Sequence, residues 1–195
     1  MKPTVMKFGG ASLTRGSQYK RVAAIVAKAP GPRAVVASAM EGITDFLLRP
    51  LPEIRQSERA AGDAIARIRT LHEAAAEEAL STQGERARVG GEISAELSRL
   101  ERLLYGISYT EELTPKTRDL AASFGERLSV RILAGAAREA GANATAHDAD
   151  AIGIVTDGVF GGATPDLPAI ESRFARELAP RIDAGEVPVI TGYFG

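Results

Sequence analysis

The segment that most constrains the fold is the N-terminal stretch, residues 4–38, in which two apolar runs flank a helical pattern. The first run, residues 4–8, favours a β-strand and ends at two glycines. Residues 17–29 then place apolar side chains at helical spacing, and Pro-Gly-Pro at residues 30–32 ends that pattern. Residues 34–38 form a second apolar run. This order predicts a βαβ unit, whose two parallel strands are joined by a right-handed crossover.

The middle of the chain has the pattern of two amphipathic helices. One lies between residues 53 and 80, with an apolar stripe formed by Ile65, Ile68, Leu71 and Ala75. A polar break with Gly84, Gly90 and Gly91 follows. The second stripe consists of Ile93, Leu97, Leu100, Leu104 and Ile107. The pattern predicts a helical hairpin at about residues 53–107, packed beside the sheet. Its simplest role is a supporting lobe without chemistry.

The last part of the chain alternates between helix and strand patterns. Thr114 and Pro115 are typical of an N-cap and a first helical position, and the helix is expected to reach about residue 140. Its expected buried face holds Leu120, Phe124, Leu128 and Leu133. Further expected elements are strands at residues 144–147 and 152–156, a helix at 169–179 and a final strand at 187–191. The alternation predicts an α/β protein with a largely parallel sheet.

Composition narrows the functions that this chain can have. The 195 residues include 24 Lys+Arg and 25 Asp+Glu, which argues against a nucleic-acid partner bound through a broad basic face. Cysteine is absent, which excludes thiolate chemistry and cysteine-based metal sites. The two histidines, His72 and His147, are expected to be surface or satisfied polar residues. No signal peptide and no apolar run of ~20 residues is present, so we expect a cytoplasmic protein with no membrane partner.

The loops after the predicted strands are the expected place for a ligand. In open α/β sheets, ligands bind beyond the carboxyl ends of the parallel strands. The loops expected there are rich in small or polar residues and comprise residues 7–12, 38–45, 157–163 and 192–195.

The loop around Gly9 and Gly10 is a candidate anion site. Paired glycines let backbone N–H groups approach an anion, and Lys7 beside them is a point charge suited to phosphate oxygens. A helix N-terminus would add positive potential if the loop leads directly into it. A tight turn without a ligand also explains these glycines. Neither G-x-x-x-x-G-K-[ST] nor G-x-G-x-x-G follows the strand, so a P-loop or Rossmann protein is not expected.

Two other regions hold candidate binding residues. Ser38 and Thr44 lie on either side of Gly42, where they either bind a ligand or provide turn and cap hydrogen bonds. Within the third long helix, Gly125 costs about 1 kcal/mol relative to Ala, so close packing against a neighbour or a ligand is expected to compensate. The adjacent Glu126 either presents a carboxylate to a substrate amine or is solvated or paired with an arginine.

Several short segments occur in an order typical of one enzyme family. They are Val-Met-Lys-Phe-Gly-Gly at residues 5–10, Ser-Ala-Met at 38–40 with Thr44, Glu-Leu-Thr-Pro-Lys-Thr-Arg-Asp at 112–119, Ser-Phe-Gly-Glu-Arg-Leu-Ser at 123–129, Ile-Val-Thr-Asp at 154–157 with Phe160 and Gly161, and Val-Pro-Val-Ile-Thr-Gly at 187–192. On these segments the chain resembles the N-terminal part of an aspartate kinase of the amino-acid kinase superfamily, most of all the archaeal type. The resemblance implies a three-layer αβα sandwich with a mainly parallel sheet.

The resemblance also implies an activity. It is the transfer of the γ-phosphoryl group of ATP, carried with Mg²⁺, to the side-chain carboxylate of L-aspartate, which opens the route to lysine, threonine and methionine. The resemblance implies that Lys7 neutralises charge on the transferring phosphoryl group. It also implies that Phe8, Gly9 and Gly10 lie at the ATP phosphates. Such a reaction needs positioning and charge stabilisation rather than a protein nucleophile.

On the acceptor side, the resemblance places Thr44 and Glu126 at aspartate, with Glu126 binding its ammonium group. Ser38 and Tyr193 lie at positions that line the site. Two departures from the family pattern are Ala11, where a hydroxyl residue is usual, and Gly-Tyr-Phe-Gly at residues 192–195, where Gly-Phe-Ile-Gly is usual.

The family continues with a Gly-Arg-Gly-Gly-Ser-Asp segment, the remaining ATP-binding half and ACT regulatory domains. We therefore expect residues 1–195 to be the aspartate-binding part of the kinase domain, a fragment or a truncated product with little activity alone. One alternative is a sibling kinase for glutamate, acetylglutamate or a nucleotide. Another is a non-catalytic subunit that pairs with a separate C-terminal half. An exposed final strand and an unpaired sheet edge would favour association, either as a homo-oligomer or with that half.

Overall fold

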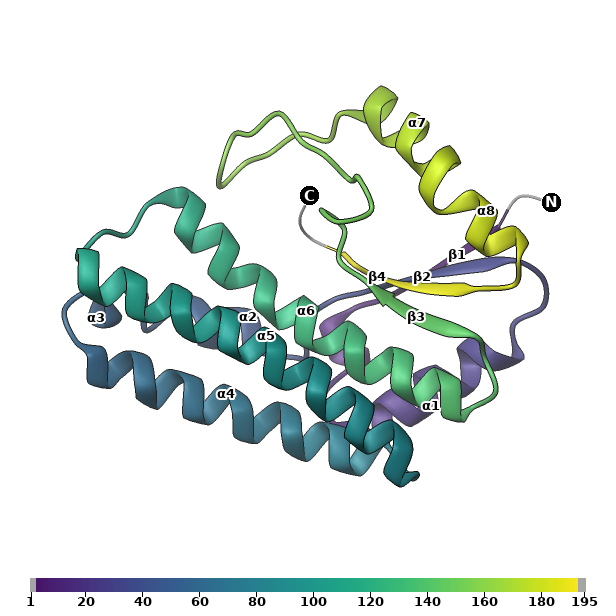
Figure 1. Ribbon diagram of the computed structural model, residues 1–195, viewed down its shortest axis with the longest axis horizontal. Helices are drawn as coiled ribbons and strands as arrows, with labels where there is room; N and C mark the ends of the chain where they lie inside the picture. Colours follow the sequence, from purple (N-terminus) through teal and green to yellow (C-terminus); the bar gives the residue numbers. More distant parts are fainter. Residues whose placement is uncertain (1–2, 193–195) are drawn as a thin grey trace.

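The protein is built around a four-stranded parallel sheet. The computed structural model describes residues 3–192, and its strands lie in the order β1 (Thr4–Phe8), β2 (Arg33–Ala37), β4 (Val187–Thr191) and β3 (Ala144–His147). Every neighbouring pair is parallel. All the carboxyl ends of the strands therefore lie at one edge of the sheet, as the α/β prediction requires (Figure 1).

The predicted N-terminal βαβ unit is present. A single 3₁₀ turn, η1 (Gly10–Ser12), follows β1, and helix α1 (Gly16–Lys28) leads back to β2. Residues 17–29 had been expected to be this helix, so its bounds agree to within one residue at each end. β1 lies at the edge of the sheet and pairs only with β2 among the described residues.

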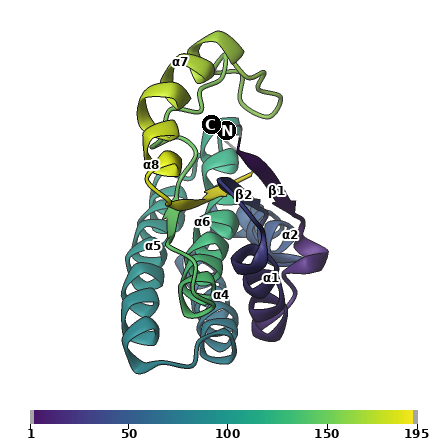
Figure 2. The ribbon, with the colours of Figure 1, turned by 90° about the vertical axis from the view of Figure 1, so that its right-hand side faces the viewer.

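Helices cover both faces of the sheet, which confirms the three-layer arrangement (Figures 1 and 2). One face carries α1 and the long helix α6 (Pro115–Glu139), which is buried along most of residues 121–137. The other carries α7 (Leu167–Glu177) and α8 (Ala179–Asp183). Thr114 caps α6 in a capping box with Thr117, as its sequence pattern indicated. Leu120, expected in its buried face, is partly exposed.

The predicted helical hairpin packs against α6 and α1. It consists of α4 (Glu58–Ala79) and α5 (Gln83–Thr110), preceded by the short helices α2 (Ile43–Leu48) and α3 (Leu51–Ile54). The expected polar break at Gly84, Gly90 and Gly91 is wrong, because α5 runs through all of them. The turn lies before them and ends at Thr82, whose hydroxyl accepts a hydrogen bond from Glu85 N and so caps α5.

Two other expectations about strands are wrong. Residues 152–156 are not a strand of the sheet, because their backbone groups bond within a turn and a small loop. Ile154 N donates to Ala149 O, and Val155 O accepts a hydrogen bond from Asp166 N. The final strand is also not exposed: β4 lies between β2 and β3 and is buried throughout. The sheet edges are therefore β1 and β3.

Most of the buried side chains between the sheet and its helices are apolar. Tyr19 is fully buried there, and its hydroxyl lies 2.8 Å from Ser129 Oγ on α6. Burial raises the pKa of this phenol. A smaller core under α7 and α8 consists of Ala34, Ala149, Leu178, Ile182 and Ile190. Within residues 3–192, no helix is long and apolar enough to cross a bilayer.

Candidate functional site

A cavity of about 380 Å³ opens where β1, β2 and β4 end and where α2 and the first half of α6 approach them. This is the edge of the sheet where α/β proteins bind their ligands. The residues that line it are Lys7, Gly10, Ser38, Ala39, Met40, Glu41, Gly42, Thr44, Ala122, Ser123, Glu126 and Gly192.

Most of the residues proposed from the sequence meet in this cavity. Lys7, Gly10, Ser38, Thr44 and Glu126 all line it, although they come from three separate segments of the chain.

The remaining candidates lie elsewhere. Phe8 and Gly9 are not among the lining residues, and Tyr193 is outside the described residues. The roles of all these residues in binding or catalysis stay predictions.

The glycine loop approaches the second loop through its backbone. Ser38 N donates to Phe8 O at 3.0 Å, which joins the ends of β1 and β2. A Cβ at Gly10 would lie 3.1 Å from Ala39 O, so only glycine fits there without a shift of the backbone. The loop does not lead directly into α1, because the turn η1 and three further residues separate them. The helix N-terminus therefore does not add its positive end to this loop.

The second loop enters α2 through a left-handed residue. Gly42 has φ of 77°, a conformation that favours glycine, and Ile43 N donates to Met40 O at 3.0 Å. This turn reverses the chain after Ser38 and places Thr44 in the first turn of α2, at the wall of the cavity.

Helix α6 forms the wall opposite the strand ends. A Cβ at Gly125 would lie 2.9 Å from Ala39 Cβ and 3.1 Å from Ile43 Cγ2. Close packing against a neighbour therefore explains the glycine within the helix, as one reading of the sequence expected. The contact brings the buried Glu126 to the end of β4, where its Oε1 would lie 3.7 Å from a Cβ at Gly192.

Ser123 is a cavity residue that the sequence interpretation did not single out. It lies three positions before Glu126, and residues at this spacing share one face of a helix. Ser123 Oγ donates to Leu120 O at 2.8 Å and accepts from Arg127 Nε at 3.2 Å. The same spacing rule would have identified Ser123 and Ala122 once Glu126 was placed in a ligand site.

The charges of the cavity suit a ligand that carries both signs. Lys7 forms no ion pair with any residue in the described range, and its side chain is exposed at the cavity. Glu41 and Glu126 supply carboxylates, and Ser38, Thr44 and Ser123 supply hydroxyl groups. Such a set can bind an ammonium group at a carboxylate and an anionic group at the lysine.

A buried ion-pair cluster lies directly behind Ser123. Arg127 and Arg131 of α6 both bond to Asp148, and Arg131 also pairs with Glu96 of α5 at 2.9 Å. Burial alone would raise the pKa of Asp148, but hydrogen bonds and charge from Arg131 and Arg127 outweigh it and hold the pKa below its usual range. Asp148 is therefore ionised at neutral pH and fixes both arginines.

The two histidines lie away from the cavity. His72 is completely buried in α4, and its Nδ1 lies 2.8 Å from Ile68 O, whereas Nε2 has no hydrogen-bond partner. The expectation of a surface or satisfied residue is therefore wrong for His72. Burial lowers its pKa to about 4. His147 Nε2 lies 2.7 Å from Glu186. Within the described range, no three His, Asp or Glu side chains form a group that could hold a metal ion.

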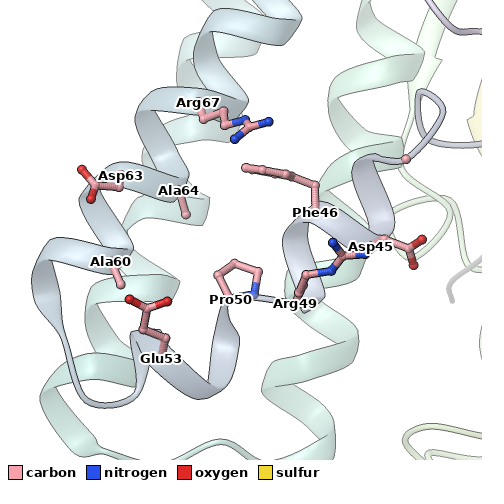
Figure 3. Close-up of a pocket in the computed structure, with 10 residues that line it drawn as sticks. Asp45, Phe46, Arg49, Pro50, Glu53, Ala60, Asp63, Ala64 and Arg67 are labelled. Carbon is pink, nitrogen blue, oxygen red and sulfur yellow. The ribbon is translucent and has the colours of Figure 1, made fainter.

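A larger cleft of about 620 Å³ lies on the other side of α2, between α2, α3 and α4 (Figure 3). Its floor includes Phe46, Pro50 and Ala64, and the guanidinium of Arg67 stacks 4.8 Å from the centre of the Phe46 ring. None of the candidate residues from the sequence lines it. The smaller cavity is the better candidate site, because the glycine loop and the strand ends converge there.

Sequence comparisons match the chain to one protein family. The family model of the amino acid kinase family matches residues 2–195. Aspartokinase 2, chloroplastic, of Arabidopsis thaliana is 32% identical over 98% of this chain and 35% of its own length. Lysine-sensitive aspartokinase 3 of Escherichia coli is 31% identical over 98% of this chain and 40% of its own length. The chain thus spans between about a third and two fifths of these relatives.

Solved structures share the fold. The structure of Escherichia coli aspartokinase III in complex with aspartate and ADP matches 98% of this chain and 41% of that chain, with a TM-score of 0.85 and 26% identity. Aspartate kinase from Clostridium acetobutylicum matches 99% of this chain and 39% of that chain, with a TM-score of 0.71 and 22% identity. The second match supports the fold alone.

Proposed function

The chain belongs to the amino acid kinase family, and we propose that it is the acceptor-binding part of an aspartate kinase. The proposed reaction transfers the γ-phosphoryl group of ATP to the side-chain carboxylate of L-aspartate. The observation that carries the proposal is the convergence of Lys7, Thr44 and Glu126 on one cavity beyond the strand ends. The relative in complex with aspartate and ADP supports the choice of ligands.

The acceptor is held by groups of opposite charge. Glu126 accepts hydrogen bonds from the ammonium group of aspartate, and its burial strengthens this interaction because water competes less. The hydroxyl groups of Ser38 and Thr44 bind the carboxylates. Lys7 faces the side-chain carboxylate and the incoming phosphoryl group, and it stabilises the negative charge that both bring to the transition state.

The proposed donor is ATP, with Mg²⁺ bound to its phosphates. Gly9 and Gly10 lie at the end of β1, where backbone N–H groups can approach phosphate oxygens, and Phe8 precedes them. The proposed setting is the cytoplasm. The protein is proposed to act as a homo-oligomer or together with an ATP-binding half. Within residues 3–192 the outer edge of β1 has no neighbouring strand, which supports association.

Isothermal titration with four compounds tests the acceptor. The compounds are L-aspartate, L-glutamate, N-acetyl-L-glutamate and uridine monophosphate, which represent the sibling kinases. We expect L-aspartate to bind about tenfold more tightly than L-glutamate, since one methylene group is worth at least that much in a fitted site. N-acetyl-L-glutamate has no ammonium group for Glu126 and is expected not to bind. Preferred binding of any other compound contradicts the proposal.

A pair of variants tests the role of Glu126. Glu126→Gln removes the charge opposite the ammonium group and is expected to weaken L-aspartate binding by about tenfold or more, because a hydrogen bond to a charged group is lost. Glu41→Gln is the matched control, since Glu41 lines the same cavity but is exposed and has no proposed contact with the ammonium group. Equal effects of the two substitutions would contradict the assignment.

A further inference from the structure

Arg127 connects the wall of the cavity to two carboxylates behind it. Its side chain is 3% exposed, and its guanidinium bonds to Asp148 and, at 2.7 Å, to Asp150 Oδ2. Its Nε donates to Ser123 Oγ at 3.2 Å. One planar guanidinium therefore contacts both the cavity residue Ser123 and the segment that follows β3.

The hydrogen bonds of Ser123 leave its hydroxyl group able to accept a hydrogen bond from a ligand in the cavity, but not to donate one. Its hydroxyl proton is donated to Leu120 O, and one lone pair accepts from Arg127 Nε. A serine hydroxyl has one proton and two lone pairs, so the second lone pair is what remains for a ligand. Ser123 thus acts as an acceptor, on the same face of α6 as the carboxylate of Glu126.

The segment after β3 is tied in turn to the opposite wall of the cavity. Ala149 N donates to Thr191 Oγ1 at 2.8 Å, in a buried contact at the end of β4. Thr191 is followed directly by Gly192, which lines the cavity. Ser123 is therefore connected to Gly192 by a continuous chain of contacts. Hydrogen bonds link Ser123 to Arg127, Arg127 to Asp148 and Ala149 to Thr191, and the backbone links Asp148 to Ala149 and Thr191 to Gly192. Both ends of this chain of contacts border the cavity.

We propose that Arg127 is a positioning residue of the acceptor site: it fixes Ser123 as a hydrogen-bond acceptor beside Glu126 and sets the distance between α6 and the end of β4. Ser123 and Glu126 then form one site for a free α-ammonium group, which selects amino acids over their N-acylated forms. This inference rests on the proposed function for its ligand, but the positioning itself is a property of the ligand-free protein.

The geometry requires arginine rather than any cation. A guanidinium presents donors in a fixed planar fork, so it can hold two carboxylates and a hydroxyl group in set directions. A lysine ammonium keeps the charge and loses the fork. Arg131 and Glu96 complete the cluster, and Arg99 bonds to Glu96 at 3.0 Å, so the charges of the buried groups are compensated.

Two variants and one control test the proposal. Arg127→Lys keeps the charge without the fork. Asp150→Asn removes a partner whose side chain is 47% exposed, so this variant is expected to fold even if the first does not. Arg138→Lys is the control, because Arg138 also lies on α6 and pairs with a carboxylate, Glu85, at 2.7 Å, but does not contact the cavity.

The first readout is the position of the amide resonances of Ser123 and Gly192 in ¹H–¹⁵N spectra without ligand. Both are expected to shift in Arg127→Lys and Asp150→Asn and to stay unchanged in Arg138→Lys. The second readout is the Kd for L-aspartate, which is expected to rise about tenfold in Arg127→Lys and to stay within about twofold in the control, since small misplacements in a positioned site are costly.

The amide shifts and the Kd distinguish a failure of the proposed function from a failure of the positioning role of Arg127. If the wild-type chain does not bind L-aspartate, the proposed function fails, but the amide shifts still test the role of Arg127. If both variants lose stability while the Ser123 and Gly192 amides and the Kd remain as in the wild type, Arg127 is only a structural residue and the inference is overturned.

Discussion

His72 is a titratable side chain enclosed in the helical hairpin without a charged partner. It lies in the interior of α4, with only Ile68 O within hydrogen-bonding distance of its ring among the described residues. Burial lowers its pKa to about 4, so the folded protein holds the ring neutral. The unfolded chain, in which histidine titrates near about 6.5, binds the proton more readily.

We therefore expect acid to destabilise the protein through His72. The free energy of unfolding has its full value, as far as His72 contributes, above pH 6.5. This contribution is lost as the pH falls toward 4, because the unfolded chain binds the proton first. The expected loss between pH 7 and pH 5 is roughly 2 kcal/mol of unfolding free energy. Urea unfolding of the wild type and of His72→Met at both pH values measures it. An equal loss in His72→Met would show that other groups cause the pH dependence.

At the scale of elements, the contact of α6 with α2 and the loop before it determines the shape of the cavity. This contact depends on Gly125, because a Cβ there would lie 2.9 Å from Ala39 Cβ and 3.1 Å from Ile43 Cγ2. Ala39 and Glu126 both line the cavity, so the helix cannot move away without changing the site.

Gly125→Ala is expected to destabilise the protein by up to about 2 kcal/mol. The gain in helix propensity is about 1 kcal/mol, but overpacking in a close contact costs more, typically ~1–3 kcal/mol and occasionally more. The control is Gly91→Ala in α5, where an added Cβ meets no atom within 4 Å and the propensity gain stands alone. Urea unfolding of both variants decides the matter. A stabilised Gly125→Ala would mean that the contact is looser than described.

Regular elements could be predicted from the sequence because their patterns are local. The βαβ unit, the hairpin and α6 follow from periodicity and from the cap at Thr114. The conformation of residues 152–156 could not be predicted in this way. Their side chains favour a β-strand, but the backbone forms a turn at Gly153, whose φ is 86°. The glycines in α5 were misjudged because tertiary packing outweighs their modest cost in a helix.

The site was only partly predictable for a related reason. Lys7, Thr44 and Glu126 were candidates from their loops and helix, and the family resemblance added their expected roles. The fold explains why such distant residues share one cavity. Arg127 could not be assigned, because its partners Asp148 and Asp150 lie 21 and 23 positions away in the sequence. Only the parallel sheet and α6 bring these charges together.

At the scale of the whole molecule, the edge of the sheet at β1 is exposed. Val5 in this strand is 66% exposed, and within residues 3–192 the outer side of β1 has no neighbouring strand. Unpaired backbone groups and an apolar side chain on an edge strand favour pairing with another chain. We expect the chain to self-associate as its concentration rises.

Sedimentation velocity over a range of concentrations measures this association. Val5→Lys is expected to shift the protein toward the monomer, because a charge on an edge strand opposes pairing. Val159→Lys is the control: Val159 is 57% exposed but lies in the loop between β3 and α7, outside the strands. A wild-type chain that is monomeric at every concentration, or equal effects of both substitutions, would contradict association through β1.

A crystal structure with L-aspartate would show whether the cavity at the ends of β1, β2 and β4 binds this amino acid, as we propose. We expect the amino acid to lie in this cavity, with its ammonium group at Glu126 and Ser123 and its side-chain carboxylate toward Lys7. Aspartate bound instead in the cleft between α2 and α4, or in the cavity with its ammonium group away from Glu126, would contradict the proposed function.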